Sequence, residues 1–213
     1  MNKHLSEVTN EDCMEGMARY PDKYFDLAIV DPPYGIGYDG QRKSTSKHGG
    51  RREKVFKGWD NKIPDEYYFN ELFRVSKNQI IWGGNYFTMF LPSSMGWIFW
   101  DKGQRINNSD GELAFTSFNR ALRVFTLNRV FILEFGDTKH PTQKPVALYK
   151  WLLQNYAKQG DKILDTHLGS GSSRIAAYEM GFDFTAFELD KEYFEAQEKR
   201  YKAHISQLKM ELV

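Results

Sequence analysis

Short apolar runs alternate along the chain with longer segments whose apolar residues recur at helical spacing. The apolar runs predict buried strands, at residues 25–30, 79–82, 96–100, 112–118, 162–165 and 183–188. The helical spacing predicts four main helices, at residues 64–76, 146–157, 172–180 and 191–208. Strands that alternate with helices indicate an α/β fold, in which helices cover both faces of a mostly parallel sheet.

Length and composition agree with a single domain spanning residues 1–213. A chain of 213 residues suffices for one sizeable core, and 41% hydrophobic and 27% charged residues are ordinary for soluble globular proteins. The single cysteine excludes an internal disulfide framework and a cysteine-based zinc site, so no metal is predicted. Neither a signal peptide nor a run of membrane-span length is visible, which predicts a cytoplasmic protein without a membrane partner.

A glycine-rich turn follows the strand expected at 162–165 and opens the helix expected at 172–180. Gly169 and Gly171 allow the backbone to approach a ligand closely, and the helix N-terminus offers unpaired N–H groups. Glu188 ends the next strand, where nucleotide-binding folds place a carboxylate on ribose hydroxyls. A third glycine at the helix-packing position is absent, which favours a nucleoside over a dinucleotide.

The strand expected at 25–30 ends at Asp31-Pro32-Pro33-Tyr34, where two prolines prevent continued sheet pairing. This turn suits the methylation of an exocyclic amine, whose lone pair is delocalised into its ring. Asp31 and a backbone carbonyl held by the prolines can accept the two amine hydrogens, while Tyr34 offers a flat face to a flipped-out base. The predicted catalytic residues are therefore Asp31, Pro32, Pro33 and Tyr34, acting by direct transfer.

A basic loop, predicted at residues 39–62, follows this turn directly. The net charge of +1 is small, so attraction to nucleic acid must be local. Clustered Lys and Arg bind phosphates with little sequence preference, and a place beside Tyr34 favours DNA contact over simple solvation. The predicted DNA contacts are Arg42, Lys43, Lys47, Arg51, Arg52, Lys54 and Lys57, with Arg120, Arg123 and Arg129 as weaker candidates for base reading.

Three segments together resemble the DNA amino-methyltransferases that act on adenine N6 or cytosine N4. Asp31 to Tyr34 looks like their catalytic tetrapeptide, residues 140–145 like their cofactor-flanking segment, and residues 165–173 like their cofactor loop. This order is that of the β class, and the whole chain resembles small phage- and prophage-type adenine methyltransferases. The resemblance implies a Rossmann-like methyltransferase fold, the cofactor S-adenosylmethionine, and double-stranded DNA as substrate in a bacterial or phage-infected cell.

The resemblance also implies a circular permutation, in which a strand at residues 5–8 completes the cofactor half. Asp12 would then contact the adenine amine of the cofactor, although a helix-cap role is equally open. The residues implied in cofactor binding are Asp12, Asp31, Thr142, Lys144, Pro145, Asp165, His167, Leu168, Gly169, Ser170, Gly171, Ser172, Glu188 and Leu189.

The chain departs from the family pattern at two places. His167 stands where an aromatic residue, commonly Phe, is usual, and Ser172-Ser173 stand where Thr is usual. The target-recognition insertion, expected at about 103–139, is short for a dedicated domain. DNA reading therefore requires compact loops, a homodimer or both, and whether a cognate restriction enzyme exists is left open.

Three other functions compete with adenine methylation. No Pro-Cys pair occurs and Cys13 lies outside the turn, which excludes a carbon-5 cytosine methyltransferase. Cytosine-N4 enzymes more often begin the tetrapeptide with Ser, so Asp31 favours adenine over this nearest alternative. A non-catalytic DNA-binding relic is the alternative from another class, which the intact residues Asp31, Gly169 and Glu188 disfavour.

Overall fold

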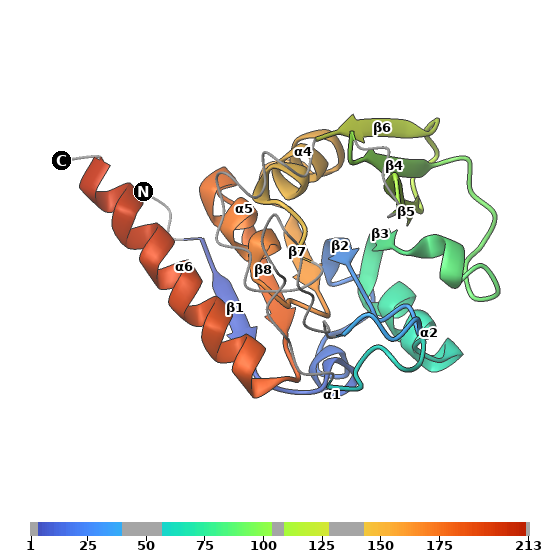
Figure 1. Ribbon diagram of the computed structural model, residues 1–213, viewed down its shortest axis with the longest axis horizontal. Coiled ribbons are helices and arrows are strands. Elements are labelled where there is room, and N and C mark those ends of the chain that lie inside the picture. Colours follow the sequence, from blue (N-terminus) through green and yellow to red (C-terminus); the bar gives the residue numbers. More distant parts are fainter. Residues whose placement is uncertain (1–3, 40–56, 104–108, 128–142, 212–213) are drawn as a thin grey trace, which may run out of the picture.

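The computed structural model describes residues 4–39, 57–103, 109–127 and 143–211, which share one eight-stranded sheet (Figure 1). The strand order is β1-β8-β7-β2-β3-β5-β4-β6. All neighbouring strands pair in parallel except β5, which runs antiparallel to β3 and β4. The strands are β1 Ser6–Thr9, β2 Phe25–Val30, β3 Ser76–Trp82, β4 Trp97–Asp101, β5 Gly111–Thr116, β6 Arg123–Thr126, β7 Lys162–Asp165 and β8 Asp183–Phe187.

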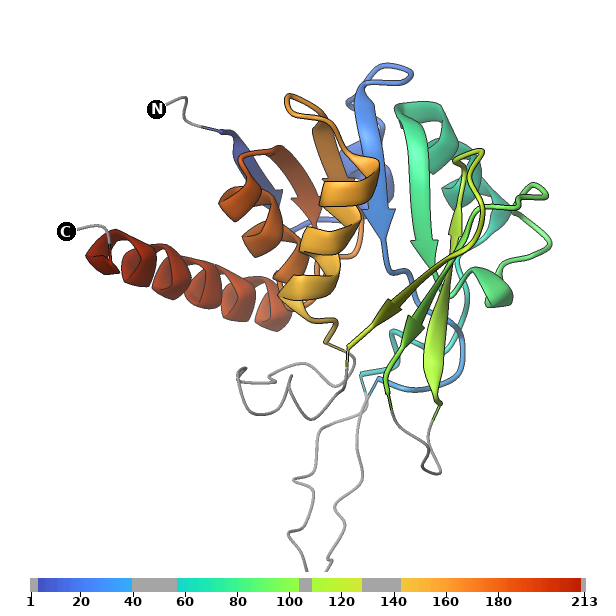
Figure 2. The ribbon, with the colours of Figure 1, turned by 90° about the horizontal axis from the view of Figure 1, so that it is seen from above.

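Helices cover both faces of this sheet, as Figure 2 shows. Leu27 and Ile29 of β2 point into a core shared with α4 and α5. Their neighbours Ala28 and Val30 point to the opposite face, into a core shared with α1 and α2. Because successive strand residues face opposite sides, an apolar run such as 25–30 is buried on both. The helices are α1 Cys13–Met17, α2 Glu66–Val75, η1 Gly84–Tyr86, α4 Val146–Tyr156, α5 Ser172–Met180 and α6 Lys191–Glu211.

The N-terminal strand completes the C-terminal half of the sheet. β1 pairs in parallel with β8, with Ser6 opposite Phe184 and Thr9 opposite Phe187. At the end of this pair, the Asn10 side-chain amide donates to the carbonyl of Glu188 at 2.7 Å. The predicted circular permutation and the predicted α/β fold are both confirmed.

One strand was not predicted. β6 lies inside the region expected to form the recognition insertion, and it pairs in parallel with β4 at the edge of the sheet. Three of its four residues are exposed, so its sequence lacks the apolar run that marks the central strands. Among the described helices, none is long and apolar enough to cross a membrane.

Candidate active site

The sheet brings the predicted catalytic turn and the predicted glycine turn to one edge. β2, β7 and β8 are parallel neighbours, so their C-terminal ends lie side by side (Figure 1). Asp31 follows β2, Asp165 ends β7, and Glu188 follows β8. Ligands of open α/β sheets bind at such carboxyl ends. The structure therefore assembles two separate sequence motifs into one site.

A buried aspartate, Asp60, shapes the chain directly after the catalytic prolines. Its Oδ1 accepts the backbone N–H of Tyr34 at 2.7 Å and that of Gly35 at 2.9 Å. Its Oδ2 accepts the N–H of Tyr38 at 2.7 Å, and its carbonyl accepts that of Gly37 at 2.9 Å. Gly35 and Gly37 have positive φ angles, which let several N–H groups converge on one carboxylate. Asp60 was not predicted as a site residue.

Both carboxylate oxygens of Asp31 have partners. The Tyr34 hydroxyl donates to Oδ1 at 2.6 Å, and the Lys144 ammonium pairs with Oδ2 at 2.5 Å. Lys144 also donates to the Tyr34 hydroxyl at 3.2 Å. Its side chain is only 3% exposed, so the pair with Asp31 is shielded from solvent on the lysine side. Asp31, Tyr34 and Lys144 thus form one hydrogen-bonded group.

Lys144 has a second acidic partner in Glu112, the second residue of β5. The Lys144 ammonium lies 3.1 Å from Glu112 Oε2, and Lys102 lies 2.6 Å from Oε1. Burial raises the pKa of Glu112, but the two ammonium groups outweigh burial and bring it to about 2. Burial lowers the pKa of Lys144, whereas Asp31 and Glu112 raise it by more. Glu112 and Lys144 are therefore both charged, and their opposite charges offset each other.

The Tyr34 ring is packed on several sides. It stacks on Tyr86 with a centroid distance of 5.0 Å and an interplanar angle of 14°, and it meets Phe87 edge-on. A Cβ on Gly83 would overlap the ring, and Gly83 has a φ of +70°, so only glycine suits this position. Burial, Asp31 and Glu112 raise the pKa of Tyr34 well above its ordinary value, so the phenol stays protonated.

At the glycine turn, the carboxyl group of Asp165 is buried among neutral donors. Its Oδ2 accepts the Ser173 hydroxyl at 2.6 Å, and its Oδ1 accepts the backbone N–H of His167 at 3.1 Å. No cation pairs with Asp165 among the residues that the structure describes. Burial raises its pKa to about 7, and the charges of Asp31 and Glu188 add to the effect. Within the described part of the chain, Asp165 is thus a buried acid whose hydrogen-bond partners are neutral.

Glu188 holds the backbone of this turn, and Asp12 lies near it at the start of α1. Glu188 accepts the N–H of Gly169 at 2.7 Å and that of Asp190 at 2.9 Å. Burial raises the pKa of Glu188. Asp12 caps α1 by accepting the N–H of Met14 at 2.7 Å, so the helix-cap role is confirmed and the cofactor role stays a prediction.

His167 occupies the position where the family usually has an aromatic residue. Its Nδ1 is 2.9 Å from the Thr166 hydroxyl, and its ring meets Tyr68 of α2 edge-on at 5.5 Å. Burial lowers the pKa of His167 to about 4, so the ring is neutral near pH 7. The imidazole therefore packs as a neutral aromatic group.

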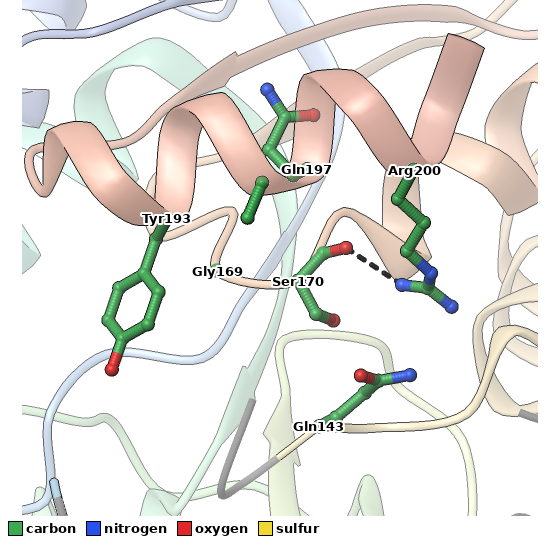
Figure 3. Close-up of a pocket in the computed structure, with 7 residues that line it drawn as sticks. Gln143, Gly169, Ser170, Tyr193, Gln197 and Arg200 are labelled. Atoms are coloured by element: carbon green, nitrogen blue, oxygen red, sulfur yellow. Dashed lines mark hydrogen bonds between the residues drawn. The ribbon is translucent and has the colours of Figure 1, made fainter. Parts of the chain in front are cut away.

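A small pocket lies between the glycine turn and α6 (Figure 3). Its cavity volume is about 30 Å³. Arg200 reaches from α6 to donate to the Ser170 carbonyl at 2.7 Å, and Gln143 faces them from the other side. Gln143 Oε1 is a buried acceptor without a hydrogen-bond partner among the described residues. The lining residues are Gln143, Gly169, Ser170, Tyr193, Ala196, Gln197 and Arg200.

Known proteins share both the sequence pattern and the fold. Residues 95–199 match the model of a DNA methylase family whose members act on N6 or N4. Over these residues, about half of its length, the chain is similar to N6/N4 DNA methylases. The type II methyltransferase M2.DpnII of Streptococcus pneumoniae is 25% identical over 252 residues, which cover 95% of this chain and 91% of the relative.

Two solved structures show the same methylase fold. The crystal structure of an M1.HpyAVI–SAM complex superposes with a TM-score of 0.62 at 18% identity, covering 91% of this chain and 98% of the other. The PvuII DNA methyltransferase, which is cytosine-N4-specific, superposes with a TM-score of 0.62 at 11% identity, covering 93% and 87%. Their fold is that of S-adenosylmethionine-dependent methyltransferases, which agrees with the predicted fold class.

Several of the predicted site residues lie together at one edge of the sheet, and others do not. Asp31, Tyr34, Lys144, Asp165 and Glu188 gather at the strand ends. Pro32 is buried and Pro33 partly exposed beside them, Pro145 precedes α4, Gly171 precedes α5, and Ser172 receives a hydrogen bond from Arg200. The side chain of Leu168 packs in the core beneath α4 and α5, whereas Leu189 is 70% exposed.

The predicted DNA contacts are placed only in part. Lys57 pairs with Asp190 and Glu192, each at 2.7 Å, and its ammonium lies 4.4 Å from the Tyr193 ring. It therefore links the end of the basic loop to α6, a role that its place in a basic run did not indicate. Arg120 donates to the carbonyl of Asn155 at 2.6 Å, and Arg123 begins β6. The other predicted DNA contacts and base-reading candidates lie outside the described residues: Arg42, Lys43, Lys47, Arg51, Arg52, Lys54 and Arg129. The predicted cofactor residue Thr142 also lies outside them.

Proposed function

We propose that this methylase transfers a methyl group from S-adenosylmethionine to the N6 amine of adenine in double-stranded DNA, with the base flipped out of the helix. The observation that carries the proposal is the turn after β2, where Asp31, Tyr34 and Lys144 form one hydrogen-bonded group at the C-terminal edge of the sheet. An exocyclic amine needs acceptors for its hydrogens, and Asp31 is the carboxylate of this turn.

Lys144 and Tyr34 determine how Asp31 can act. Each holds one carboxylate oxygen, and a carboxylate has roughly four lone-pair sites, so an acceptor site remains on each oxygen. The fixed carboxylate can then accept an amine hydrogen without reorienting, and such preorganisation supplies much of the catalysis in direct transfer. Asp60 fixes the backbone on the other side of Tyr34, so that the ring and the carboxylate move as one unit.

The residues of the glycine turn fit a cationic nucleoside. Burial raises the pKa of Asp165 to about 7, and a bound sulfonium or ammonium group would favour its charged form. Gly169 and Gly171 have positive φ angles and bring the backbone close to a ligand ahead of α5. When bound, S-adenosylmethionine supplies an activated methyl group. Asp165 would hold its cationic part, Glu188 its ribose and Asp12 its adenine.

The adenine target rests on Asp31, since cytosine-N4 enzymes more often begin the tetrapeptide with Ser. Cytosine N4 is the second candidate, because a cytosine-N4-specific enzyme shares the fold with a TM-score of 0.62. The M1.HpyAVI–SAM complex supports the cofactor assignment by its fold.

Mass spectrometry of nucleosides tests the proposal. Unmethylated plasmid DNA is incubated with the protein and S-adenosylmethionine carrying a labelled methyl group, then digested to nucleosides. We expect labelled N6-methyladenine, and a loss of at least about 10²-fold in the Asp31→Ala variant because a transition-state acceptor is removed. The matched control is Asp22→Ala, which removes a side chain that is 77% exposed. Labelled N4-methylcytosine would identify cytosine, and not adenine, as the target base. The absence of any labelled nucleoside, whichever DNA is used, would refute the proposal.

A further inference from the structure

Glu112 lies at the start of β5, where it is directly opposite Trp100 in the β4–β5 ladder. Its side chain is 25% exposed, and both of its oxygens contact an ammonium group. Lys102 binds Oε1 from the end of β4, packed 5.1 Å from the Trp100 ring, while Lys144 binds Oε2 from the segment before α4. Glu112 thus joins the antiparallel part of the sheet to the catalytic turn.

These contacts form a chain of alternating charges from Lys102 through Glu112 and Lys144 to Asp31. An ammonium group has three N–H donors. Lys144 directs them to Asp31 at 2.5 Å, Glu112 at 3.1 Å and the Tyr34 hydroxyl at 3.2 Å. The Lys144 ammonium also lies 5.2 Å from the centre of the Trp82 ring. Each donor of Lys144 therefore has one acceptor, and the acceptors are fixed by β2, β5 and the catalytic turn.

Loss of the Glu112 charge would leave this balance incomplete. Lys144 would keep Asp31 as its one acidic partner, and the ammonium would draw closer to that carboxylate. Asp31 would then be held more tightly by Lys144 and less well placed to accept a hydrogen from the target amine. A misplacement of about 1 Å in a positioned group can lower a rate by about 10²-fold.

We propose that Glu112 is a positioning residue, which shares the Lys144 ammonium with Asp31 and so keeps Asp31 and Tyr34 in the geometry needed for methyl transfer. This inference rests on the proposed function. Glu112 itself does not touch the reacting atoms, since it acts through Lys144.

The test is Glu112→Gln, which keeps the shape of the side chain and removes its charge. We expect kcat to fall by about 10²-fold, with KM for DNA and Kd for S-adenosylmethionine within about twofold of the starting protein, because the substituted group lies outside both ligand sites. The matched control is Glu179→Gln, since Glu179 also pairs with two basic side chains, Lys150 and His204, and is 17% exposed. We expect this control to keep its kcat within about twofold.

A second measurement does not depend on catalysis. Amine-reactive labelling followed by mass spectrometry reports how well Lys144 is shielded and protonated. We expect Lys144 to be nearly unreactive in the starting protein at pH 9 and to react at least about tenfold faster in Glu112→Gln, because its pKa falls when an acidic partner is lost. The groups facing Lys144 are Asp31, Tyr34 and Glu112, with Lys102 behind Glu112.

The two measurements separate the failure of this inference from that of the proposed function. A starting protein that methylates no DNA, with labelling of Lys144 accelerated by Glu112→Gln as expected, would refute the function and leave the Glu112–Lys144 link standing. A cooperatively folded Glu112→Gln variant with unchanged kcat would overturn the positioning role. Equal losses of kcat in Glu112→Gln and Glu179→Gln would also overturn it, because they would indicate a general loss of structure.

Discussion

The two halves of the site differ in how their acids are compensated. At the catalytic turn, Asp31 and Glu112 are matched by Lys144 and Lys102. At the glycine turn, Asp165 and Glu188 contact hydroxyl and backbone N–H groups, and burial raises the pKa of both. The acids of the first half pair with lysines, whereas no cation within the described ranges forms an ion pair with Asp165 or Glu188. This difference agrees with the proposal that the catalytic turn is preorganised and that the glycine turn binds a cationic ligand.

Removal of Lys144 should break the compensation at the catalytic turn, and this is the largest effect that we expect. Lys144→Met leaves Asp31 and Glu112 without their shared cation, and methyl transfer should fall by at least about 10²-fold. Loss of one partner from a buried pair costs about 3 kcal/mol of unfolding free energy, at the low end of its range because Asp31 is 20% exposed and can hydrate. Urea denaturation and a methyl-transfer assay measure the two effects. Full activity in this variant would show that the catalytic turn does not depend on its cation.

Removal of the charge from Asp165 should stabilise the protein and weaken cofactor binding. The pKa of Asp165 is about 7 in the folded protein, above its ordinary value of 3.8, so its ionisation opposes folding above pH 7 and this penalty vanishes as the pH falls toward 4. Asp165→Asn should therefore raise the unfolding free energy at pH 8 by on the order of 3 kcal/mol, and leave it unchanged near pH 4.

The asparagine fits the same contacts, because its carbonyl can accept the His167 N–H and its amide can donate to Ser173. Calorimetric titration of Asp165→Asn with S-adenosylmethionine should show binding weakened by at least about tenfold, as expected for a lost charged contact. Equal stability of the variant and the starting protein at pH 8 would mean that Asp165 is compensated after all.

The smallest expected effect is a release of protons on cofactor binding. A cation that binds beside Asp165 lowers the pKa of that carboxyl, so the protonated fraction present near pH 7 is released. Calorimetry in buffers of different ionisation enthalpy should detect about half a proton per site at pH 7, and close to none at pH 8.5. Asp165→Asn should abolish whatever release is seen. A release that persists in that variant would have to come from another group, such as Glu188.

The central strands and the order of the motifs were predictable because they depend on local patterns. The apolar run 25–30 and the glycines after β7 carry their signals within a few residues. Asp60 and Glu112 carry no such signal, since each is a single acid whose partners come from distant parts of the chain. β6 was missed for a related reason, because an exposed edge strand has no apolar run. The acidic partners of Lys57 could not be predicted either, because they lie 133 and 135 residues away, and its contact with phosphate stays a prediction.

The contacts around Asp60 determine where the length of this chain can vary. Asp39 accepts the N–H of Gly58, and Gly37 donates to the carbonyl of Asp60. Residues 37–39 are therefore hydrogen-bonded to residues 58–60. These two contacts close a stem directly beside the catalytic turn. The free energy of closing such a stem depends only weakly on the length of chain between its two sides. The number of residues between Asp39 and Gly58 can therefore change at little cost while the stem keeps Tyr34 in place.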